Sequence, residues 1–194
     1  MLNDNTPFSI FNQWYKEAIE KVIDLPNAFA LATASSEGIP SVRMLLLKYF
    51  DEKGFVFFTN YNSLKGKHIF ENPQGSMLFY WKELKRQVRI NGIIKKISKK
   101  ESNEYFKERP FGSKVSSWAS QQSQIIPNRE FLLERYREIF EKFKNSEIPC
   151  PRYWGGYILK PYYFEFWKEA NDRLHERNCF ELINGKWVKF VLAP

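Results

Sequence analysis

The chain has 194 residues, 43% of them hydrophobic and 18% aromatic, which is enough for one domain with a packed core. No apolar stretch approaches the ~20 residues that span a membrane. Its two cysteines have no metal-site or disulfide spacing, so we expect a cytoplasmic protein. Basic residues giving the net charge of +8 are interspersed with acidic ones, and no zinc-finger or RNA-recognition pattern occurs, so we expect no nucleic-acid or membrane partner.

The hydrophobic pattern of the N-terminal half predicts one helix followed by short strands. Apolar residues recur at three- and four-residue steps over residues 7–24, as in an amphipathic helix. Apolar and β-branched runs separated by turn signals then follow at intervals of about ten residues, which is typical of an antiparallel barrel or sandwich. The predicted strands span residues 29–34, 41–50, 55–59, 76–81 and 87–97.

Three further helices and three further strands are predicted. Ser63 can cap a helix to residue 70, Ser98 can cap another to about residue 108, and apolar periodicity indicates a third. The last two strands are joined by Asn184-Gly185, a hairpin signal. The third helix spans residues 128–144, and the strands span 157–167, 173–182 and 187–192.

These elements predict a mainly β fold, a six- to eight-stranded antiparallel barrel with flanking helices. We expect residues 1–194 to form a single domain in four parts. These are an N-terminal helix (1–25), core barrel strands (26–97), a helical insertion (98–145) and C-terminal strands (154–194).

Several familiar catalytic and nucleotide-binding patterns are missing from the sequence. It contains no G-x-G-x-x-G, no P-loop and no G-x-S-x-G, so a glycine-rich phosphate loop or an elbow serine is not expected. His68 and His175 are the only histidines and lie far apart, so we expect no metal site. Any bound phosphate must therefore be held by side chains from several elements.

Two cations in the predicted strand 41–50 are candidates for anion binding. Arg43 and Lys48 are five residues apart, so in a continuous strand they point to opposite faces. Because they flank a leucine run, each side chain needs an anion unless it reaches water. The pattern indicates either two anion sites, one on each face, or two strand ends in solvent.

Three other segments could bind phosphate or a heterocycle. Ser63 and Lys65 stand at a predicted helix start, where free N–H groups favour a phosphate, although a plain helix cap is the alternative. Tyr105 and Arg109 share a predicted helix face, with Ser113 on the loop that follows, and could clamp a phosphate. The side-chain amides of Gln87 and of Gln122, which precedes Ser123, could bind the edge of a heterocycle, or the Gln122-Ser123 segment could be a polar loop.

Near the C-terminal end, Arg173, His175 and Arg177 alternate along a predicted strand. Side chains two positions apart share one face and lie roughly 7 Å apart, which would give a rigid cationic wall. Such a wall suits a planar, anionic or electron-poor ligand. The alternative is an edge strand whose basic residues discourage aggregation.

Taken together, these motifs resemble the pyridoxine (pyridoxamine) 5′-phosphate oxidase family of FMN enzymes with the split-barrel fold. They keep the family's order from about residue 7 onward, and as a set they are specific. The matching segments are Arg43 to Lys48, Phe57 to Asn60, Arg86 to Arg89, Tyr105-Phe106 with Arg109-Pro110, Gln122-Ser123, Trp154 to Tyr157, Glu165 to Trp167, Arg173 to Arg177 and Leu192 to Pro194.

The resemblance implies a homodimer with FMN at the subunit interface. Arg43 and Lys65 would hold the FMN phosphate and ribityl chain, and a second subunit would supply Gln122 and Ser123. The other implied cofactor-binding residues are Met44, Leu45, Leu46, Leu47, Lys48, Phe58, Thr59, Gln87, Trp167 and Arg177.

For the substrate, the resemblance implies a phosphate site and a ring site. Lys48, Tyr105, Arg109 and Ser113 would bind the phosphate of the pyridine substrate. Arg173 and His175, the implied catalytic residues, would hold its ring against the flavin.

The implied reaction is FMN-dependent oxidation of pyridoxamine or pyridoxine 5′-phosphate to pyridoxal 5′-phosphate, with dioxygen reduced to hydrogen peroxide. Two alternatives stay open: a split-barrel protein that binds FMN without turnover, and a flavin oxidase of another aromatic substrate, as in phenazine synthesis. The chain departs from the family at Leu64, where an arginine is usual, and this predicts weaker FMN binding.

Overall fold

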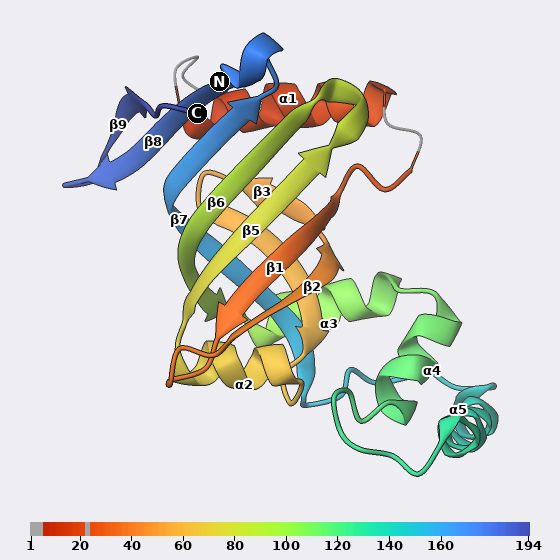
Figure 1. Cartoon of the computed structure of the whole chain (residues 1–194). Coiled ribbons are helices and arrows are strands. Elements are labelled where there is room, and N and C mark those ends of the chain that lie inside the picture. The colour runs from red at the N-terminus through yellow and green to blue at the C-terminus, as the bar shows by residue number, and fades with distance from the viewer. Residues whose placement is uncertain (1–5, 22–23) are drawn as a thin grey trace.

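The structure, a computed structural model, describes residues 6–21 and 24–194. These residues form one antiparallel sheet of nine strands, curled into a half-barrel (Figure 1). The path β2-β1-β5-β6-β7-β4-β3 makes up the half-barrel, and β8 pairs with both β7 and β9. The strands are β1 Ala28–Ala34, β2 Pro40–Leu46, β3 Tyr49–Asp51, β4 Gly54–Asn60, β5 Gln74–Trp81, β6 Arg86–Lys96, β7 Trp154–Lys168, β8 Glu176–Ile183 and β9 Lys186–Val191.

Helices cover the two ends of the half-barrel and extend to one side. In Figure 1, α1 lies across one end of the sheet, close to the β8–β9 hairpin, and α2 lies at the opposite end. Helices α4 and α5 stand beside the sheet, beyond α3. The helices are α1 Pro7–Lys21, α2 Leu64–Glu71, α3 Lys99–Glu108, α4 Phe111–Ala119 and α5 Arg129–Phe143.

Aromatic side chains fill the inside of the half-barrel. Phe11 of α1 is fully buried, and its ring makes edge-to-face contacts with Phe50, Phe55 and Phe79. Burying a side chain of this size contributes roughly 1.5–3 kcal/mol, so the apolar face of α1 closes the core. A second buried cluster that includes Phe106 and Trp154 joins α3 and α4 to the start of β7.

Most predicted elements are present, including helices at residues 99–108 and 129–143 and a β8–β9 hairpin with positive φ at Asn184 and Gly185. The helix predicted over residues 7–24 is observed to Lys21, and its predicted residues 22 and 23 lie outside the described part of the chain. No helix of the described residues has the length and apolar character needed to cross a membrane.

The continuous strand predicted over residues 41–50 is wrong, as is the count of six to eight strands. The chain changes partner there: β2 pairs with β1, whereas β3 pairs with β4. Leu47 lies between the two strands, its N–H bonded to the carbonyl of Asn27 and its side chain buried in the core. Arg43 and Lys48 therefore do not share one strand.

The strand predicted from residue 173 is also wrong at its start. Asn171–Arg173 is a short 3-10 turn, and β8 begins only at Glu176. Asp172 and Arg173 have left-handed backbones, with φ of 53° and 61°, which a strand cannot contain. The expected wall of Arg173, His175 and Arg177 on one strand face therefore does not form.

Candidate active site

Arg43 is held in place by three neighbouring oxygen atoms. Its Nη1 donates to the carbonyl of Leu31 at 3.2 Å and to Oγ1 of Thr33 at 2.7 Å, and its Nη2 donates to Oγ of Ser41 at 2.6 Å. The hydroxyl of Thr33 also lies 3.2 Å from Nδ1 of the buried His68. These contacts fix the guanidinium without neutralising its charge.

Lys65 of α2 is a buried cation surrounded by neutral acceptors. Only 6% of its surface is exposed, and its Nζ donates to Thr59 Oγ1, Ser63 Oγ and Gln122 Oε1, each at 3.2 Å. Burial, together with the positive charge of Arg43, lowers the pKa of Lys65 to about 8.

Arg43 and Lys65 together make a site for an anion. Within residues 6–21 and 24–194, neither side chain takes part in a salt bridge. Two neighbouring cations in a partly buried position, with hydroxyl donors beside them, fit a phosphate group and therefore fit the phosphate of FMN.

The prediction that Gln122 comes from a second subunit is wrong for this cluster. Gln122 contacts Lys65 and Thr59 of its own chain, because the loop after α4 brings it back to the start of α2. The adjacent Ser123 has a left-handed backbone, with φ of 69°.

A second group of predicted residues lines one cavity of about 430 Å³. Its lining includes Lys48, Tyr105, Arg109 and Ser113, all four residues expected to bind the substrate phosphate. Nζ of Lys48 lies 5.9 Å from the centre of the Tyr105 ring. These side chains come from the β2–β3 connection and from the region of α3 and α4, so only the fold brings them together.

The prediction that Arg109 shares a helix face with Tyr105 is wrong, because α3 ends at Glu108. Arg109 follows the end of α3 in an extended conformation, and its guanidinium packs 4.5 Å above the ring of Trp154. Its Nη1 donates to Oγ of Ser117 at 2.6 Å. Ser113 lies within α4, a helix that the sequence did not predict, rather than on a loop.

A smaller cavity of about 320 Å³ adjoins the first, and the two share Phe58, Arg109 and Trp154. Thr59 and Gln122, which contact Lys65, also line this smaller cavity. The anion site at Lys65 is therefore next to the cavity of Lys48. Of the leucine run, Leu45 and Leu46 line the two cavities, whereas Met44 faces outward and is 65% exposed.

Gln87, Trp167 and Arg177 form one row across three strands. Gln87 of β6 is directly opposite Trp167 of β7, which is directly opposite Arg177 of β8. Their neighbours Val88 and Phe166 are buried, so the row faces the outside of the half-barrel. The sequence predicted all three as flavin-binding residues, and the register places them side by side.

His175 lies beside this row, while Arg173 is exposed on the preceding turn. The imidazole is 4.7 Å from the Trp167 ring, and its Nδ1 accepts a hydrogen bond from the N–H of Ala170. That hydrogen bond closes the turn through Asp172 and Arg173.

The row and the anion site lie at opposite ends of β7. Thr59, which contacts Lys65, pairs with Gly155, and Gln87 pairs with Trp167, 12 positions further along β7. Twelve residues of a fully extended strand span up to about 40 Å, so the two groups are well separated along β7. Figure 1 shows the same arrangement, with α2 at one end and the β8–β9 hairpin at the other.

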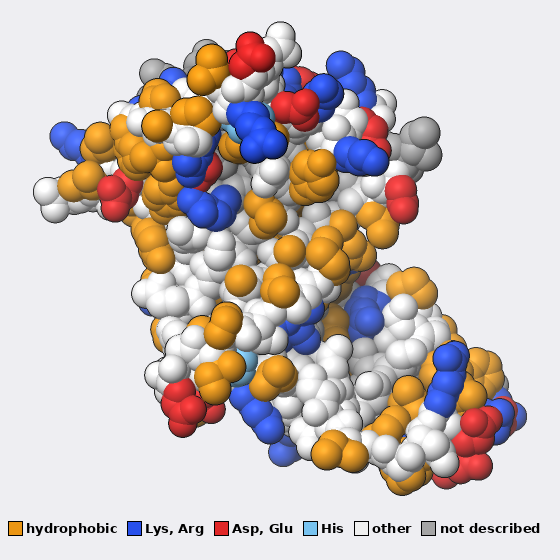
Figure 2. All heavy atoms as spheres, viewed as in Figure 1, with side chains coloured by type: hydrophobic (Ala, Val, Ile, Leu, Met, Phe, Trp, Pro, Cys, Tyr) orange, Lys and Arg blue, Asp and Glu red, His pale blue; other side chains and the backbone are white. Residues whose placement is uncertain are grey.

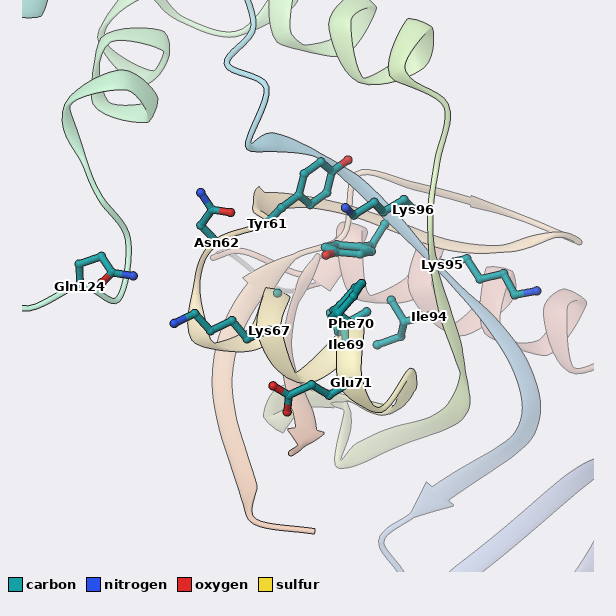
Figure 3. A pocket seen from close by; sticks show the side chains of 12 residues that line it. Tyr61, Asn62, Lys67, Ile69, Phe70, Glu71, Ile94, Lys95, Lys96 and Gln124 are labelled. Atoms are coloured by element: carbon teal, nitrogen blue, oxygen red, sulfur yellow. The ribbon is translucent and has the colours of Figure 1, made fainter. Parts of the chain in front are cut away.

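A larger cavity, of about 840 Å³, lies elsewhere in the molecule (Figure 3). Ile69, Phe70 and Ile94 lie at its centre, but Lys67 and Lys95 point away from it on opposite sides. Nζ of Lys96 makes a cation–π contact with the ring of Tyr61, 4.3 Å from its centre. Its cations do not converge on one ligand, so we assign it no role. No cluster of three or more possible metal ligands occurs in the described residues.

Solved structures share this fold. An FMN-binding protein of Nostoc punctiforme, described as related to pyridoxamine 5′-phosphate oxidase, superposes with a TM-score of 0.77 at 16% identity, covering 97% of this chain and 98% of the other. PhzG of Burkholderia lata 383, solved with tetrahydrophenazine-1-carboxylic acid, superposes with a TM-score of 0.92 at 31% identity, covering 97% and 92%. The fold is the FMN-binding split barrel, as predicted.

Sequence comparisons identify the family within the FMN-binding split-barrel fold. A family profile described as pyridoxamine 5′-phosphate oxidase matches residues 15–143, and one described as pyridoxine 5′-phosphate oxidase C-terminal dimerisation region matches residues 154–194. Pyridoxine/pyridoxamine 5′-phosphate oxidases of Aliarcobacter butzleri and Crocosphaera subtropica are 52% and 50% identical to the chain, covering 98% and 100% of it and 91% of each relative. The chain belongs to the pyridoxine/pyridoxamine 5′-phosphate oxidase family, an oxidoreductase family with FMN as cofactor.

Proposed function

We propose that the protein oxidises pyridoxamine 5′-phosphate and pyridoxine 5′-phosphate to pyridoxal 5′-phosphate, reducing dioxygen to hydrogen peroxide. The observation that carries this proposal is the presence of two adjacent cationic sites. Arg43 and Lys65 form one, and the cavity of Lys48 and Arg109 forms the other. A cofactor and a substrate that each carry a phosphate need two such sites side by side.

In this proposal Arg43, Thr59, Lys65 and Gln122 hold the cofactor phosphate. When bound, FMN supplies an acceptor for the hydride equivalent lost from C4′ of the substrate, and dioxygen then takes the electrons to give hydrogen peroxide. Lys65 remains protonated beside a dianionic phosphate, because the negative charge offsets the burial that lowers the pKa of the free side chain.

Lys48, Tyr105, Arg109 and Ser113 bind the substrate phosphate and thereby orient the pyridine ring. Arg109 is suited to this role because its stacking on Trp154 and its bond to Ser117 fix the guanidinium before the ligand arrives. Arg109→Met should raise the KM for pyridoxamine 5′-phosphate at least tenfold and leave FMN affinity unchanged. Equal loss of FMN would place Arg109 in the cofactor site instead.

The separation of the two residue groups supports a site shared between subunits. Lys65 contacts Thr59, which pairs with Gly155 near one end of β7, whereas Trp167 is near the other end of that strand. We therefore assign Arg43, Lys65 and Gln122 to one subunit at each site, and Gln87, Trp167 and Arg177 to its partner in a homodimer. Arg173 and His175 reach the substrate ring from that same partner.

The outer face of the sheet is suited to such a homodimer. Exposed apolar side chains lie on β2 and β5: Val42 and Met44 are 67% and 65% exposed, and Tyr80 is 58% exposed. Figure 2 shows the middle of this face as almost free of charged side chains, with hydrophobic side chains scattered among uncharged polar and backbone atoms, and basic side chains in the hollow toward the helices. Apolar area of this kind is typical of a subunit interface.

Mixing two inactive variants tests the shared site. Arg43→Ala and Arg177→Ala damage different halves, so after subunit exchange a mixed dimer has one site with both halves intact. About a quarter of the original FMN sites should return if subunits pair at random. No recovery, in a mixture shown to contain mixed dimers, would mean that both residues act from the same chain.

The similarity to PhzG supports an alternative function, the oxidation of another aromatic substrate. Such an enzyme has no need for four phosphate-binding side chains in one cavity. Turnover of pyridoxamine 5′-phosphate should therefore far exceed that of pyridoxamine without its phosphate. Equal kcat/KM for the two compounds would favour the alternative.

A further inference from the structure

Glu165 is a buried carboxylate next to the row of predicted flavin-binding residues. It lies in β7, opposite Arg89 of β6 and Cys179 of β8, two positions from Trp167 and on the same outward face. Only 6% of its surface is exposed. A carboxylate so deeply buried is expected to have charged or hydrogen-bonding partners.

Both oxygens of Glu165 are occupied. Oε1 accepts a hydrogen bond from Nε of Arg177 at 2.8 Å, and Oε2 accepts from the guanidinium of Arg89 and from the hydroxyl of Tyr163. Burial alone would raise the pKa of Glu165, but the hydrogen bond from Arg177 and the two positive charges hold it below its ordinary value. The carboxylate is therefore ionised at neutral pH.

Arg177 is held from a second side as well. Its Nη1 donates to the carbonyl oxygen of Ala193 at 2.8 Å, and the N–H of Leu192 bonds to its backbone carbonyl. A guanidinium has five N–H donors in one rigid plane, so two anchored donors on different nitrogens fix the orientation of that plane. The donors of Nη2 have no partner among the hydrogen bonds of the described residues, which leaves this edge for a ligand.

We propose that Glu165 is a positioning residue that sets the plane of the Arg177 guanidinium, so that its Nη2 edge meets the flavin. The inference rests on the proposed function, because it takes Arg177 as a flavin ligand. It also accounts for a buried ion pair where stability alone does not require one, since apolar residues of similar size often stabilise a protein as well. Arg89, the second cation on Glu165, is the matched control, because it belongs to the same cluster and lies outside the row.

The test is FMN binding to the apoprotein, followed by quenching of flavin fluorescence. Glu165→Gln keeps the size of the side chain but loses its charge, and should raise the Kd for FMN about tenfold. Arg89→Gln leaves the contact between Glu165 and Arg177 in place and should change the Kd less than twofold. Glu165→Gln binding FMN as tightly as the unaltered chain, or both variants losing affinity equally, would overturn the proposal.

A double variant separates positioning from general destabilisation. If Glu165 acts through Arg177, then Glu165→Gln should add no further loss of affinity to Arg177→Ala. An undiminished effect in that background would contradict the proposal. Should Glu165→Gln fail to fold, a variant ending at Leu192 removes the other anchor, and unchanged FMN affinity in that variant would count against the clamp.

The outcome also distinguishes this inference from the function on which it rests. An unaltered chain that binds no FMN overturns the proposed function and the role of Glu165 together. An unaltered chain that binds FMN, with Glu165→Gln binding equally well, overturns only the role of Glu165.

Discussion

Replacing Lys65 with methionine should weaken FMN binding without destabilising the apoprotein. The three contacts of its Nζ are all with neutral acceptors, so a phosphate would replace one of them with an anionic acceptor. Hydrogen bonds to charged groups contribute about 2 kcal/mol, which corresponds to a Kd about 30-fold higher in Lys65→Met.

The apoprotein should respond in the opposite direction. Burial lowers the pKa of Lys65 to about 8, which means that the charged side chain costs free energy in the folded state at neutral pH. Methionine is unbranched, apolar and of similar length, so it removes that cost. The free energy of unfolding, measured in urea without FMN at pH 7, should stay the same or rise.

Lys67→Met is the matched control for both measurements. Lys67 lies on the same helix but is exposed and points away from the neighbouring cavity (Figure 3). This variant should keep its FMN affinity within about twofold, because an exposed charge contributes little. If Lys65→Met and Lys67→Met lose FMN affinity equally, FMN binding depends on the overall charge of the protein. Unchanged FMN affinity in Lys65→Met would mean that the phosphate binds elsewhere.

Three further predictions concern the binding of FMN and of the substrate. Leu64→Arg adds a guanidinium at the exposed first residue of α2 and should tighten FMN several-fold; unchanged affinity would refute the idea that a phosphate contact is missing. FMN affinity should fall as the pH rises above about 8, where Lys65 of the apoprotein loses its proton, and the free energy of unfolding of the apoprotein should rise between pH ~8 and ~10.5. FMN titrations in which affinity rises with pH, or urea unfolding in which stability falls over that range, would contradict this. Arg173→Ala should lower kcat/KM with FMN still bound, whereas Arg43→Ala should lower FMN affinity itself, and similar flavin loss in both would show that the two sites are divided wrongly.

Local signals in the sequence predicted most elements. Ser98 does cap α3 by accepting from the N–H of Glu101, and Asn184-Gly185 does form the β8–β9 turn. Such features depend on neighbours within four residues, so the sequence contains the whole interaction.

The errors occurred where distant contacts decide the backbone. The break at Leu47 exists because β2 and β3 pair with different strands, and the turn at Arg173 is closed by the imidazole of His175. Neither partner can be identified from local periodicity. The division of the predicted flavin-binding residues between subunits also depends on distant contacts. Gln122 and Lys65 are 57 positions apart, and only the fold shows that the two side chains of one chain meet.

Glu165 was the functional candidate that the sequence reasoning overlooked. The sequence motif Glu165 to Trp167 includes it but indicates no role for the carboxylate. The available signal was a single acidic residue within an aromatic strand, Tyr162 to Trp167, where an ionised side chain requires a buried partner. Its partners Arg89 and Arg177 became evident only from the register of β6, β7 and β8.

Turnover with the proposed substrate tests the central claim most directly. The purified protein should show a flavin absorption spectrum and, with pyridoxamine 5′-phosphate under air, form pyridoxal 5′-phosphate and hydrogen peroxide in equal amounts. Anaerobic addition of the same substrate should bleach the flavin absorption. A protein that binds FMN but neither bleaches nor forms pyridoxal 5′-phosphate would contradict the account.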